Sequence, residues 1–371
     1  MYIEVFNTNF ERVSICDNYE SLIWTDRYNE PGDFELYFPM KKELLDIYVP
    51  DYYLVATPHG IDGIRDSEYT MIIEDLKITT DLDGGNHLIV TGRSLESILC
   101  RRIVWKQTTV SGNFQNAVKK LIEQNVTGNA KTDIGKRKIP NFVFQASEDT
   151  RITSLKIDET QYTGDVLYDA IKALCDVHDV GFSLKKNDQN QFIFNLYIGV
   201  DRSYKQTDNT YVVFSPAFDN IISSDYTENK SKYCNVTLVA GEGEGNERKT
   251  VVVGDTNAES LDRRELFTDA RDISSKIEND EGESETMSDK EYNEALTNRG
   301  KEKLKEVEIE KTFDGQVEAT QLYRYGEHFF MGDFCQLENE YGKQSRVKVI
   351  EYIHSESTNG LEEYPTFKVV E

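Results

Sequence analysis

Apolar and polar residues alternate in two neighbouring runs near the start of the chain, one around Trp24 and one from Phe34 to Phe38. Because successive side chains of a strand point to opposite faces, each run predicts a strand with one buried face. Pro31 presets the φ angle of the first central position of a turn, and Gly32 can supply the positive φ that a type II turn needs next. Residues 15–39 are therefore predicted to form a β-hairpin. Its apolar face consists of Leu22, Trp24, Tyr28, Phe34, Leu36 and Phe38, and we expect another sheet or a partner chain to cover it.

Similar runs continue to about residue 92 and predict strands at residues 52–57, 69–80 and 87–91. The apolar period then becomes helical, with Leu95, Ile98 and Leu99 on one face and Ser94 as a candidate N-cap. We therefore predict that residues 1–105 form a first antiparallel β-barrel that is closed by a short helix.

Residues 106–205 mix helical and strand patterns. Asn113 is suited to cap a helix, and Gly128 can end it in a left-handed conformation. A second helix is expected to have Asp165 in its first turn, where a carboxylate complements the helix dipole, and to stop at Gly181, where a strand hairpin follows. This segment is predicted to be an α/β middle domain.

The remainder of the chain returns to strand patterns on both sides of an acidic segment. Residues 206–253 and 310–371 are predicted to form a second β-barrel. The expected fold class is therefore α+β and β-rich, with two antiparallel β-barrel-like domains flanking α/β inserted domains.

Residues 254–309 are interpreted as an acidic linker with an inserted helix. Seven acidic residues lie between Glu278 and Glu291 and almost no apolar ones, which predicts a solvated linker or a disordered loop over residues 269–291. Ser288 and Glu291 match a capping box that begins the helix, and Gly300 on its apolar face permits close packing.

Composition narrows the functional classes. The chain has 42 Lys and Arg residues against 67 Asp and Glu residues, a net charge of −25, which argues against a nucleic-acid-binding surface. The sequence has no stretch that approaches the roughly 18 apolar residues of a membrane span, and its N-terminus lacks the pattern of a secretion signal. Five dispersed cysteines are typical of reduced thiols. We expect a soluble protein that is assembled in the cytosol and inserts into no membrane.

Few residues suggest catalysis. Cys175 and His178, with Asp176 and Asp179 nearby, could be a nucleophile and its base or half of a metal site. The sequence has no second Cys/His pair and none of the common hydrolase motifs, so a core thiol beside a surface histidine is favoured.

Three other polar groups have competing interpretations. Four loop carboxylates could hold calcium, but they lack the spacing of a calcium loop and are interpreted as solvated turns: Asp62, Asp66, Asp81 and Asp83. The glycines of residues 241–245 precede no phosphate-binding Lys-Ser/Thr and are interpreted as a hairpin tip. Three arginines could face an acidic partner, although salt bridges within or between subunits are favoured: Arg93, Arg101 and Arg102.

Three motifs carry a family resemblance: SLIWTDRYNEPGDFELYFP at residues 21–39, TGRSLES followed by ILCRRI at residues 91–103, and YGEHFFMGDFCQLEN at residues 325–339. They resemble the tail hub, or baseplate hub, proteins of tailed bacteriophages and prophages, which are related to the N-terminal structural module of tail-associated lysins. The resemblance marks the following positions as structural and assembly residues: Leu22, Trp24, Tyr28, Pro31, Gly32, Phe34, Leu36, Phe38, Gly92, Arg93, Leu95, Gly332 and Asp333.

The resemblance implies a homotrimer whose two barrels per subunit form a pseudo-sixfold ring, a symmetry adaptor between a sixfold tail tube and a threefold tip through which DNA passes. The implied partners are a tail tube or distal tail protein above, a tip, spike or fibre protein below, and a tape-measure protein in the lumen. The implied location is the distal tip of the virion tail, assembled in the bacterial cytoplasm, with no cofactor, metal or specific nucleic-acid binding.

Lysin-type relatives continue into a hydrolase or fibre segment, whereas this sequence ends at Glu371 just after a predicted strand. We therefore expect a structural protein without enzymatic activity. Two alternatives from other classes stay open: a tail-associated peptidoglycan hydrolase component, which a cell-wall zymogram would reveal, and a host-surface carbohydrate-binding tip protein, which glycan binding would reveal.

Overall fold

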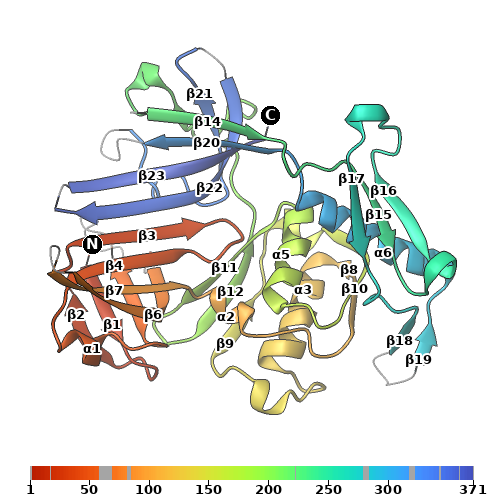
Figure 1. The fold of residues 1–371 in the computed structure, drawn as a ribbon, viewed down its shortest axis with the longest axis horizontal. Helices are drawn as coiled ribbons and strands as arrows, with labels where there is room; N and C mark the ends of the chain where they lie inside the picture. The colour runs from red at the N-terminus through yellow and green to blue at the C-terminus, as the bar shows by residue number, and fades with distance from the viewer. Residues whose placement is uncertain are drawn as a thin grey trace.

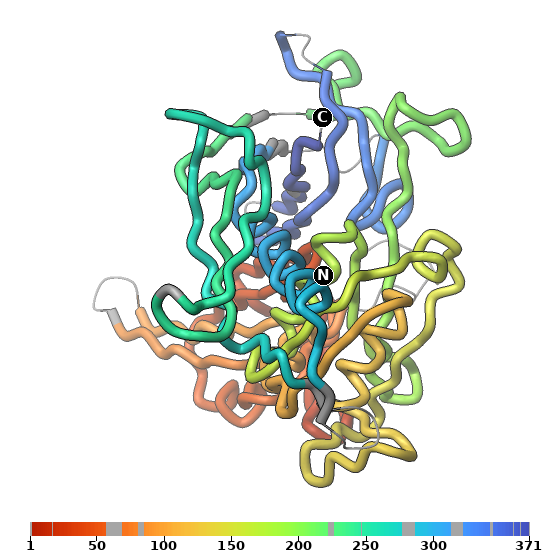
Figure 2. Tube along the Cα trace, turned by 90° about the vertical axis from the view of Figure 1, so that its right-hand side faces the viewer, coloured from red at the N-terminus to blue at the C-terminus, as the bar shows by residue number. Residues whose placement is uncertain are grey.

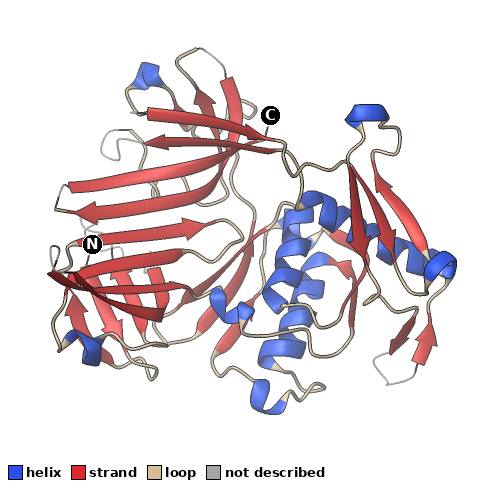
Figure 3. Cartoon of the chain, viewed as in Figure 1, coloured by secondary structure: helices blue, strands red, loops and turns tan. Residues whose placement is uncertain are grey.

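The computed structural model describes residues 2–16, 18–57, 69–81, 85–221, 223–278, 284–316, 322–341, 344–358 and 360–370. Strands dominate the left half of the molecule, and the longer helices gather in its middle and on its right (Figure 3). The fold is α+β and rich in strands, as the sequence predicted. None of the helices in these ranges is long and apolar enough to cross a membrane.

Thirteen strands form one large sheet. Its N-terminal strands are β1 (Tyr2–Phe6), β2 (Arg12–Cys16), β3 (Ser21–Arg27), β4 (Asp33–Pro39), β5 (Tyr53–Thr57), β6 (Tyr69–Asp81) and β7 (Gly85–Ser94), with the short helix α1 (Leu44–Ile47) between β4 and β5. Its C-terminal strands are β13 (Val213–Phe214), β14 (Ser223–Asn229), β20 (Glu310–Gln316), β21 (Phe334–Glu338), β22 (Gln344–Ser357) and β23 (Gly360–Val369). The main path runs β14-β20-β23-β22-β3-β4-β7-β6-β5-β1-β2, and β21 lies beside β22 and β13.

The two predicted barrels are therefore not separate closed domains. Among the described strands no sheet closes on itself, because the main path ends at β14 and at β2. Instead β22 pairs antiparallel with β3 (Figure 1). Each of these strands supplies hydrogen-bond partners for the edge of the other, so the two β-rich segments of the chain form one sheet. Each segment keeps its own apolar core, one around Trp24 and one around Phe214.

The strand order repeats between the two segments. In chain order, β3, β4, β6 and β7 lie in the sheet as β3-β4-β7-β6, and β14, β20, β22 and β23 lie as β14-β20-β23-β22. Both halves thus follow the order first-second-fourth-third. The two β-rich segments are related in topology, although the sequence shows no exact repeat.

The middle region packs helices against two small sheets. Its elements are α2 (Ser97–Cys100), β8 (Thr108–Asn113), α3 (Phe114–Ile122), the π-helical turn Glu123–Thr127, the 3₁₀ turn Gly135–Arg137, β9 (Phe142–Gln145), α4 (Thr150–Thr153), β10 (Lys156–Tyr162), α5 (Leu167–Val177), β11 (Gly181–Lys186) and β12 (Phe192–Tyr197). The Asn113 side chain accepts the N–H of Asn116 at 3.1 Å, so the predicted N-cap is confirmed. Gly128 follows the π-helical turn with a φ of 64° but a ψ of 174°, which lies outside the left-handed helical region, so the predicted left-handed cap is wrong. Helix α5 begins at Leu167, so Asp165 precedes it and does not lie in its first turn as predicted. The helix ends at Val177, four residues before the predicted stop at Gly181, and the left-handed residue after it is Asp179, with a φ of 55°.

A third layer lies at the right of the molecule in Figure 1. It contains β15 (Val236–Ala240), β16 (Thr250–Gly254), β17 (Glu265–Asp269), the pair β18 (Lys276–Glu278) and β19 (Ser284–Thr286), and helix α6 (Asp289–Lys305). The 3₁₀ turns Gly245–Glu247 and Ser260–Asp262 belong to this layer, whereas the 3₁₀ turn Pro216–Phe218 lies between β13 and β14 of the large sheet. Viewed from the side, α6 lies between the β15–β17 sheet and the middle region (Figure 2).

The predicted linker is largely structured where the structure describes it. Ala270, Ile273 and Met287 are buried with Tyr292 of α6, which supplies the apolar contacts that the acidic composition concealed. The interpretation of residues 269–291 as a solvated linker is therefore wrong for these residues. The Ser288–Glu291 capping box is confirmed in both directions, because each partner's N–H donates to the other's side chain.

Candidate assembly sites

The turn between β3 and β4 is built around Asn29. Asn29 has a φ of 52°, whereas Gly32 does not adopt a positive φ, so the predicted type II turn is wrong. The buried Asn29 amide donates to the Asp176 carboxylate at 2.8 Å and to the Val180 carbonyl at 3.0 Å, and its oxygen accepts the N–H of Phe182 at 3.1 Å. Asparagine tolerates the left-handed region better than most residues, and these bonds fix the turn to the middle region.

Gly32 is required for space. A Cβ atom at Gly32 would lie 2.1 Å from the carbonyl oxygen of Thr25, well inside van der Waals contact. The Gly32 N–H also donates to the Ser94 hydroxyl at 2.9 Å. Ser94 thus ties β7 to the hairpin turn. The prediction that Ser94 is the N-cap of α2 is wrong, because Glu96 occupies that position.

Most of the predicted assembly residues of the hairpin lie inside the N-terminal core. Their exposed fractions are between 0 and 2% for Leu22, Trp24, Phe34, Leu36 and Phe38. Gly92 lies under β6, where a Cβ would come within 1.8 Å of the Ile72 carbonyl oxygen, and Leu95 is buried in the middle core. These side chains hold the β-rich segment together, and their role in assembly stays a prediction.

Asp333 and Gly332 join the middle region to the C-terminal strands. The buried Asp333 carboxylate accepts the Val200 N–H at 2.6 Å, the Arg202 guanidinium at 2.8 Å and the Phe330 N–H at 3.1 Å. Gly332 has a φ of 85° and approaches the rings of Tyr28 and Tyr197 so closely that a Cβ would lie 2.8 Å from the Tyr28 ring. The third sequence motif therefore marks a close contact between distant segments.

The junction of the two β-rich segments carries ion pairs. Arg27 of β3 donates to Glu351 of β22 at 2.6 Å, to Asp33 at 2.9 Å and to the Pro31 carbonyl at 3.3 Å. The Arg27 side chain is 25% exposed and that of Glu351 is 22% exposed, so solvent screens this pair only in part. The pair fixes the register in which the two segments meet.

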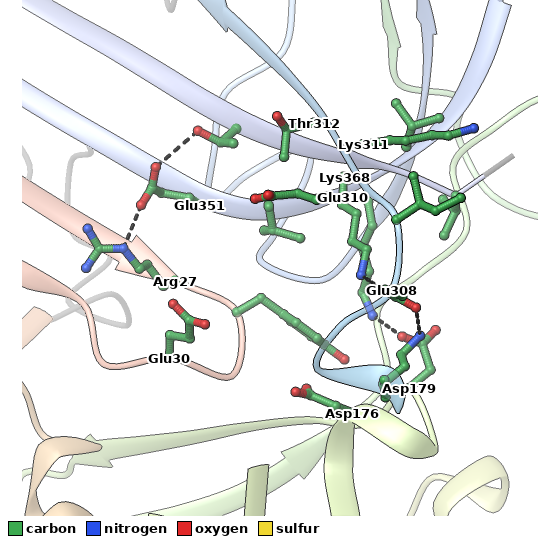
Figure 4. Close-up of a pocket in the computed structure, with 18 of the residues that line it drawn as sticks. Arg27, Glu30, Asp176, Asp179, Glu308, Glu310, Lys311, Thr312, Glu351 and Lys368 are labelled. Atoms are coloured by element: carbon green, nitrogen blue, oxygen red, sulfur yellow. Dashed lines mark hydrogen bonds and ion pairs between the residues drawn. The ribbon is translucent and has the colours of Figure 1, made fainter. Parts of the chain in front are cut away.

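A cleft of about 820 Å³ opens beside this junction (Figure 4). Its lining comes from the β3–β4 turn, α5, β22, β23 and the connection between α6 and β20, and it contains six basic and six acidic side chains. Lys368 and Lys305 both pair with Glu308. Lys172 lies 3.0 Å from Asp176 and 3.4 Å from Glu30, and these carboxylates raise its pKa although burial alone would lower it. The cleft is thus electrically balanced inside a strongly acidic chain.

Lys348 is the most deeply buried cation of the cleft. It is 4% exposed, donates to Asp179 at 2.5 Å and lies 3.8 Å from the centre of the Tyr28 ring. Burial lowers the pKa of Lys348, although Asp179 acts in the opposite direction. These contacts connect β22, the turn after α5 and the β3–β4 turn, so the cleft is a structural junction.

The arginines near α2 are used internally. Arg93 donates to Glu74 at 2.6 and 2.9 Å, and Arg101 donates to Asp51 at 2.7 Å. Arg102 donates to the Arg101 carbonyl at 2.9 Å. The predicted internal salt bridges are therefore confirmed for Arg93 and Arg101.

The candidate catalytic group is structural. Burial raises the pKa of the Cys175 thiol well above its usual value and lowers that of His178, whose ring packs edge-on against Phe114. Asp176 and Asp179 are bound to Asn29, Lys172 and Lys348 as described above. A buried protonated thiol is a poor nucleophile, which favours the interpretation of Cys175 as a core thiol.

No group of three or more His, Cys, Asp or Glu side chains suited to a metal ion occurs among the described residues. The proposed calcium carboxylates Asp62, Asp66 and Asp83 lie outside the described residues, as does the side chain of Asp81. The glycine-rich segment 241–245 connects β15 to β16, which confirms a hairpin connection there.

Two strand edges were missed by sequence reasoning. The outer edge of β14, and that of β6 beyond residue 73, border no strand that the structure describes. On these edges Ile78 is 51% exposed and Tyr226 is 41% exposed. An apolar residue at a strand position was the only available signal, and it does not distinguish an outer edge from a buried face.

Three solved structures share this fold over nearly their whole length. A tail protein from Neisseria meningitidis MC58 has a TM-score of 0.55 and 14% identity, covering 99% of this chain and 96% of its own. The 43 kDa tail protein of prophage MuSo2 from Shewanella oneidensis has a TM-score of 0.57 and 11% identity, covering 100% and 98%. Prophage tail protein gp18 from Listeria monocytogenes EGD-e has a TM-score of 0.52 and 12% identity, covering 99% and 94%. The fold is that of phage and prophage tail proteins.

The sequence profile described as "Siphovirus ReqiPepy6 Gp37-like protein" matches residues 2–364. The chain therefore belongs to the siphovirus ReqiPepy6 Gp37-like family, a family of phage tail proteins. This membership, together with the fold, confirms the resemblance to phage tail proteins drawn from the sequence motifs. A comparison with curated protein sequences gives no match.

Proposed function

We propose that the protein is a structural hub of the tail tip, a homotrimeric ring that adapts a sixfold tail tube to a threefold tip and leaves a passage for DNA. The tail tube or a distal tail protein would bind above the ring, a tip, spike or fibre protein below it, and a tape-measure protein would lie in its lumen.

The repeated strand order is the observation that carries this proposal. One chain presents two β-rich halves of the same topology, joined edge to edge through β3 and β22. Three chains would present six such halves upward while the middle and right-hand regions occur three times. A contact in which one surface binds a different surface of the next copy forms a closed ring when its rotation closes after a whole number of copies.

The polar clusters support a role without chemistry. The side chains of Lys348, Asp333 and Asp176 are bound to other parts of the same chain, and the Cys175 thiol is buried. These contacts join segments that are far apart in the sequence, and such contacts would keep a ring subunit rigid. The protein would therefore bind other proteins and catalyse no reaction.

A density map of the native particle tests the proposal through copy number. We expect three copies of this chain around one axis at the end of the tail tube. One copy or six copies at that position, or a position on the outer surface of the capsid, would overturn the hub assignment. Lysis of cell-wall material by the purified chain in a zymogram would overturn the non-enzymatic role separately.

A further inference from the structure

The two halves of the sheet can be matched residue by residue. Strands β6 and β22 each contain one bulge, at Glu74 and at Ile350, and each ends seven residues later, at Asp81 and at Ser357. Before its bulge, each of these two strands also pairs with a neighbouring strand at an equivalent position. Ile72 of β6 pairs with Tyr53 of β5, and the equivalent Lys348 of β22 pairs with Phe334 of β21.

The match extends across the other strands. Phe34 pairs with Gly92, and its equivalent Phe313 pairs with Phe367 at the same position relative to the bulge. One strand further, Trp24 of β3 pairs with Phe34, and Tyr226 of β14 pairs with Phe313. Strands β3 and β14 are both seven residues long, and Tyr226 in β14 is therefore the equivalent of Trp24 in β3.

One junction of this repeat is made within the chain and the other is not. Beyond its bulge, β22 pairs with β3 and brings His354 opposite Trp24. By the residue match, β6 beyond its bulge should pair with β14 and bring Ile78 opposite Tyr226. Within one chain, β6 and β14 lie at opposite ends of the repeated strands and do not pair with each other.

We propose that β6 of one copy pairs antiparallel with β14 of the next copy, with Ile78 opposite Tyr226 and the pairing running from Asp75–Asn229 to Asp81–Ser223. This inference rests on the proposed ring and defines the surface that closes it. The contact joins two different edges of the same chain, so it repeats from copy to copy and can close around an axis.

Burial supports this register. At the junction inside the chain, His354 is 8% exposed and Trp24 is 2% exposed, because each strand covers the edge of the other. Their equivalents Ile78 and Tyr226 are 51% and 41% exposed. Exposed apolar side chains on strand edges are unfavourable in a soluble chain, and facing one another across a new strand pair would remove both from water.

The polar ends of the pairing are also compatible. The ion pair Arg27–Glu351 closes one end of the junction inside the chain. Its equivalent between copies is Asn229 opposite Asp75, where an amide can donate to a carboxylate. A second copy is favoured over an unrelated partner because both complementary edges, with matching lengths and register, are present on this chain.

Cysteine cross-linking tests the register. In a chain with the partly exposed native cysteines replaced, Cys100→Ser and Cys234→Ser, the matched pair Ile78→Cys with Tyr226→Cys is compared with the shifted pair Thr80→Cys with Glu228→Cys. The shifted positions lie on the same face but are displaced by four residues, about 13 Å along the strands. Equal amounts of two single variants, Ile78→Cys and Tyr226→Cys, are also mixed, so that any disulfide between them must join two chains.

After mild oxidation of concentrated protein, we expect the matched pair to give at least roughly fivefold more covalent dimer and trimer than the shifted pair, because a disulfide needs Cβ atoms about 4 Å apart. A trimeric mass by light scattering with no excess over the shifted pair would overturn the register while the ring stands. A monomeric mass at every concentration, together with no cross-link, would overturn the ring as well.

Discussion

At the scale of single residues, Gly32 allows a sharp test. Gly32→Val places a side chain where even a Cβ would lie 2.1 Å from the Thr25 carbonyl oxygen. We expect the free energy of unfolding to fall by about 2–3 kcal/mol, because the backbone of β3 must move. Chemical denaturation of the purified variant measures this change.

The control for Gly32→Val is Gly245→Asn. Gly245 has a φ of 54° and nothing within 4 Å of an added Cβ, and asparagine tolerates the left-handed region. The control should keep its stability to within about 0.5 kcal/mol. Equal stabilities for Gly32→Val and the unchanged chain would contradict the close approach at Thr25.

Lys348 predicts a pH dependence of stability. Burial lowers its pKa in the folded chain below the usual value near 10.5, so the unfolded chain binds more protons between these two values. Stability therefore rises with pH between the folded and unfolded pKa values of Lys348. Below the folded pKa, Lys348 is protonated in both states and makes no contribution to the pH dependence. Relative to Lys348→Met, the unchanged chain should gain stability as the pH rises toward about 10.5, by about 1.4 kcal/mol for each unit by which the pKa is lowered.

Thermal unfolding at several pH values measures the Lys348 effect, with the exposed Lys131→Met as the matched control. Lys131→Met controls for the loss of one positive charge at an exposed position. If the stability difference for Lys348→Met varies with pH no more than that for Lys131→Met, the ammonium group is not held in a desolvated site.

At the scale of elements, helix α6 depends on Gly300. A Cβ at Gly300 would lie 2.7 Å from Val253 and 2.8 Å from Val239, side chains of the sheet on which α6 packs. On an exposed helix face, replacing glycine by alanine would raise the free energy of unfolding by about 1 kcal/mol. Gly300→Ala should instead lower stability by about 1–3 kcal/mol, since the helix must move away from the sheet.

The matched control for Gly300→Ala is Asn293→Ala on the exposed face of the same helix. It should raise stability slightly or leave it unchanged, because alanine is the better helix former. A gain in stability for both variants, measured by denaturation, would mean that α6 does not pack as closely as described.

Local elements were predictable because their signals lie close together in the sequence. The Asn113 cap, the Ser288–Glu291 box and the packing at Gly300 were all readable from spacing. Contacts between distant segments were not. The Gly32–Ser94 bond spans 62 residues, the Lys348–Asp179 bond 169 and the Arg27–Glu351 pair 324, and no local pattern encodes such partners.

The same limit explains the two predicted barrels. Alternation identified most strands, but it could not show that β22 and β3 pair and make one sheet. The acidic composition of residues 269–291 likewise hid Ala270, Ile273 and Met287, because three apolar residues among many charges are too few to shift the average. For the candidate site, the motifs located the turn and Asp333, while the cleft and the edges β6 and β14 emerged only from the fold.

At the scale of the whole molecule, the distribution of charge bears on the proposed passage of DNA through the ring. The chain carries a net charge of −25, yet the cleft contains as many basic as acidic side chains. The cations are thus used to hold segments together rather than displayed as a basic surface. A ring built from such subunits would repel phosphates along its walls, which suits a channel that must let DNA slide through.

We therefore expect the isolated protein not to bind duplex DNA at about 150 mM salt, and the inner wall of the ring to be acidic or neutral. A mobility-shift titration measures binding, and repeating it at about 50 mM salt shows whether any weak complex involves phosphate contacts, because affinity then falls steeply as salt rises. The alternative is that the negative charge lies on the outer surface, where it serves solubility. A salt-sensitive shift at 150 mM, or a lysine-lined channel in the particle map, would contradict the expectation about the lumen while leaving the ring and its copy number untouched.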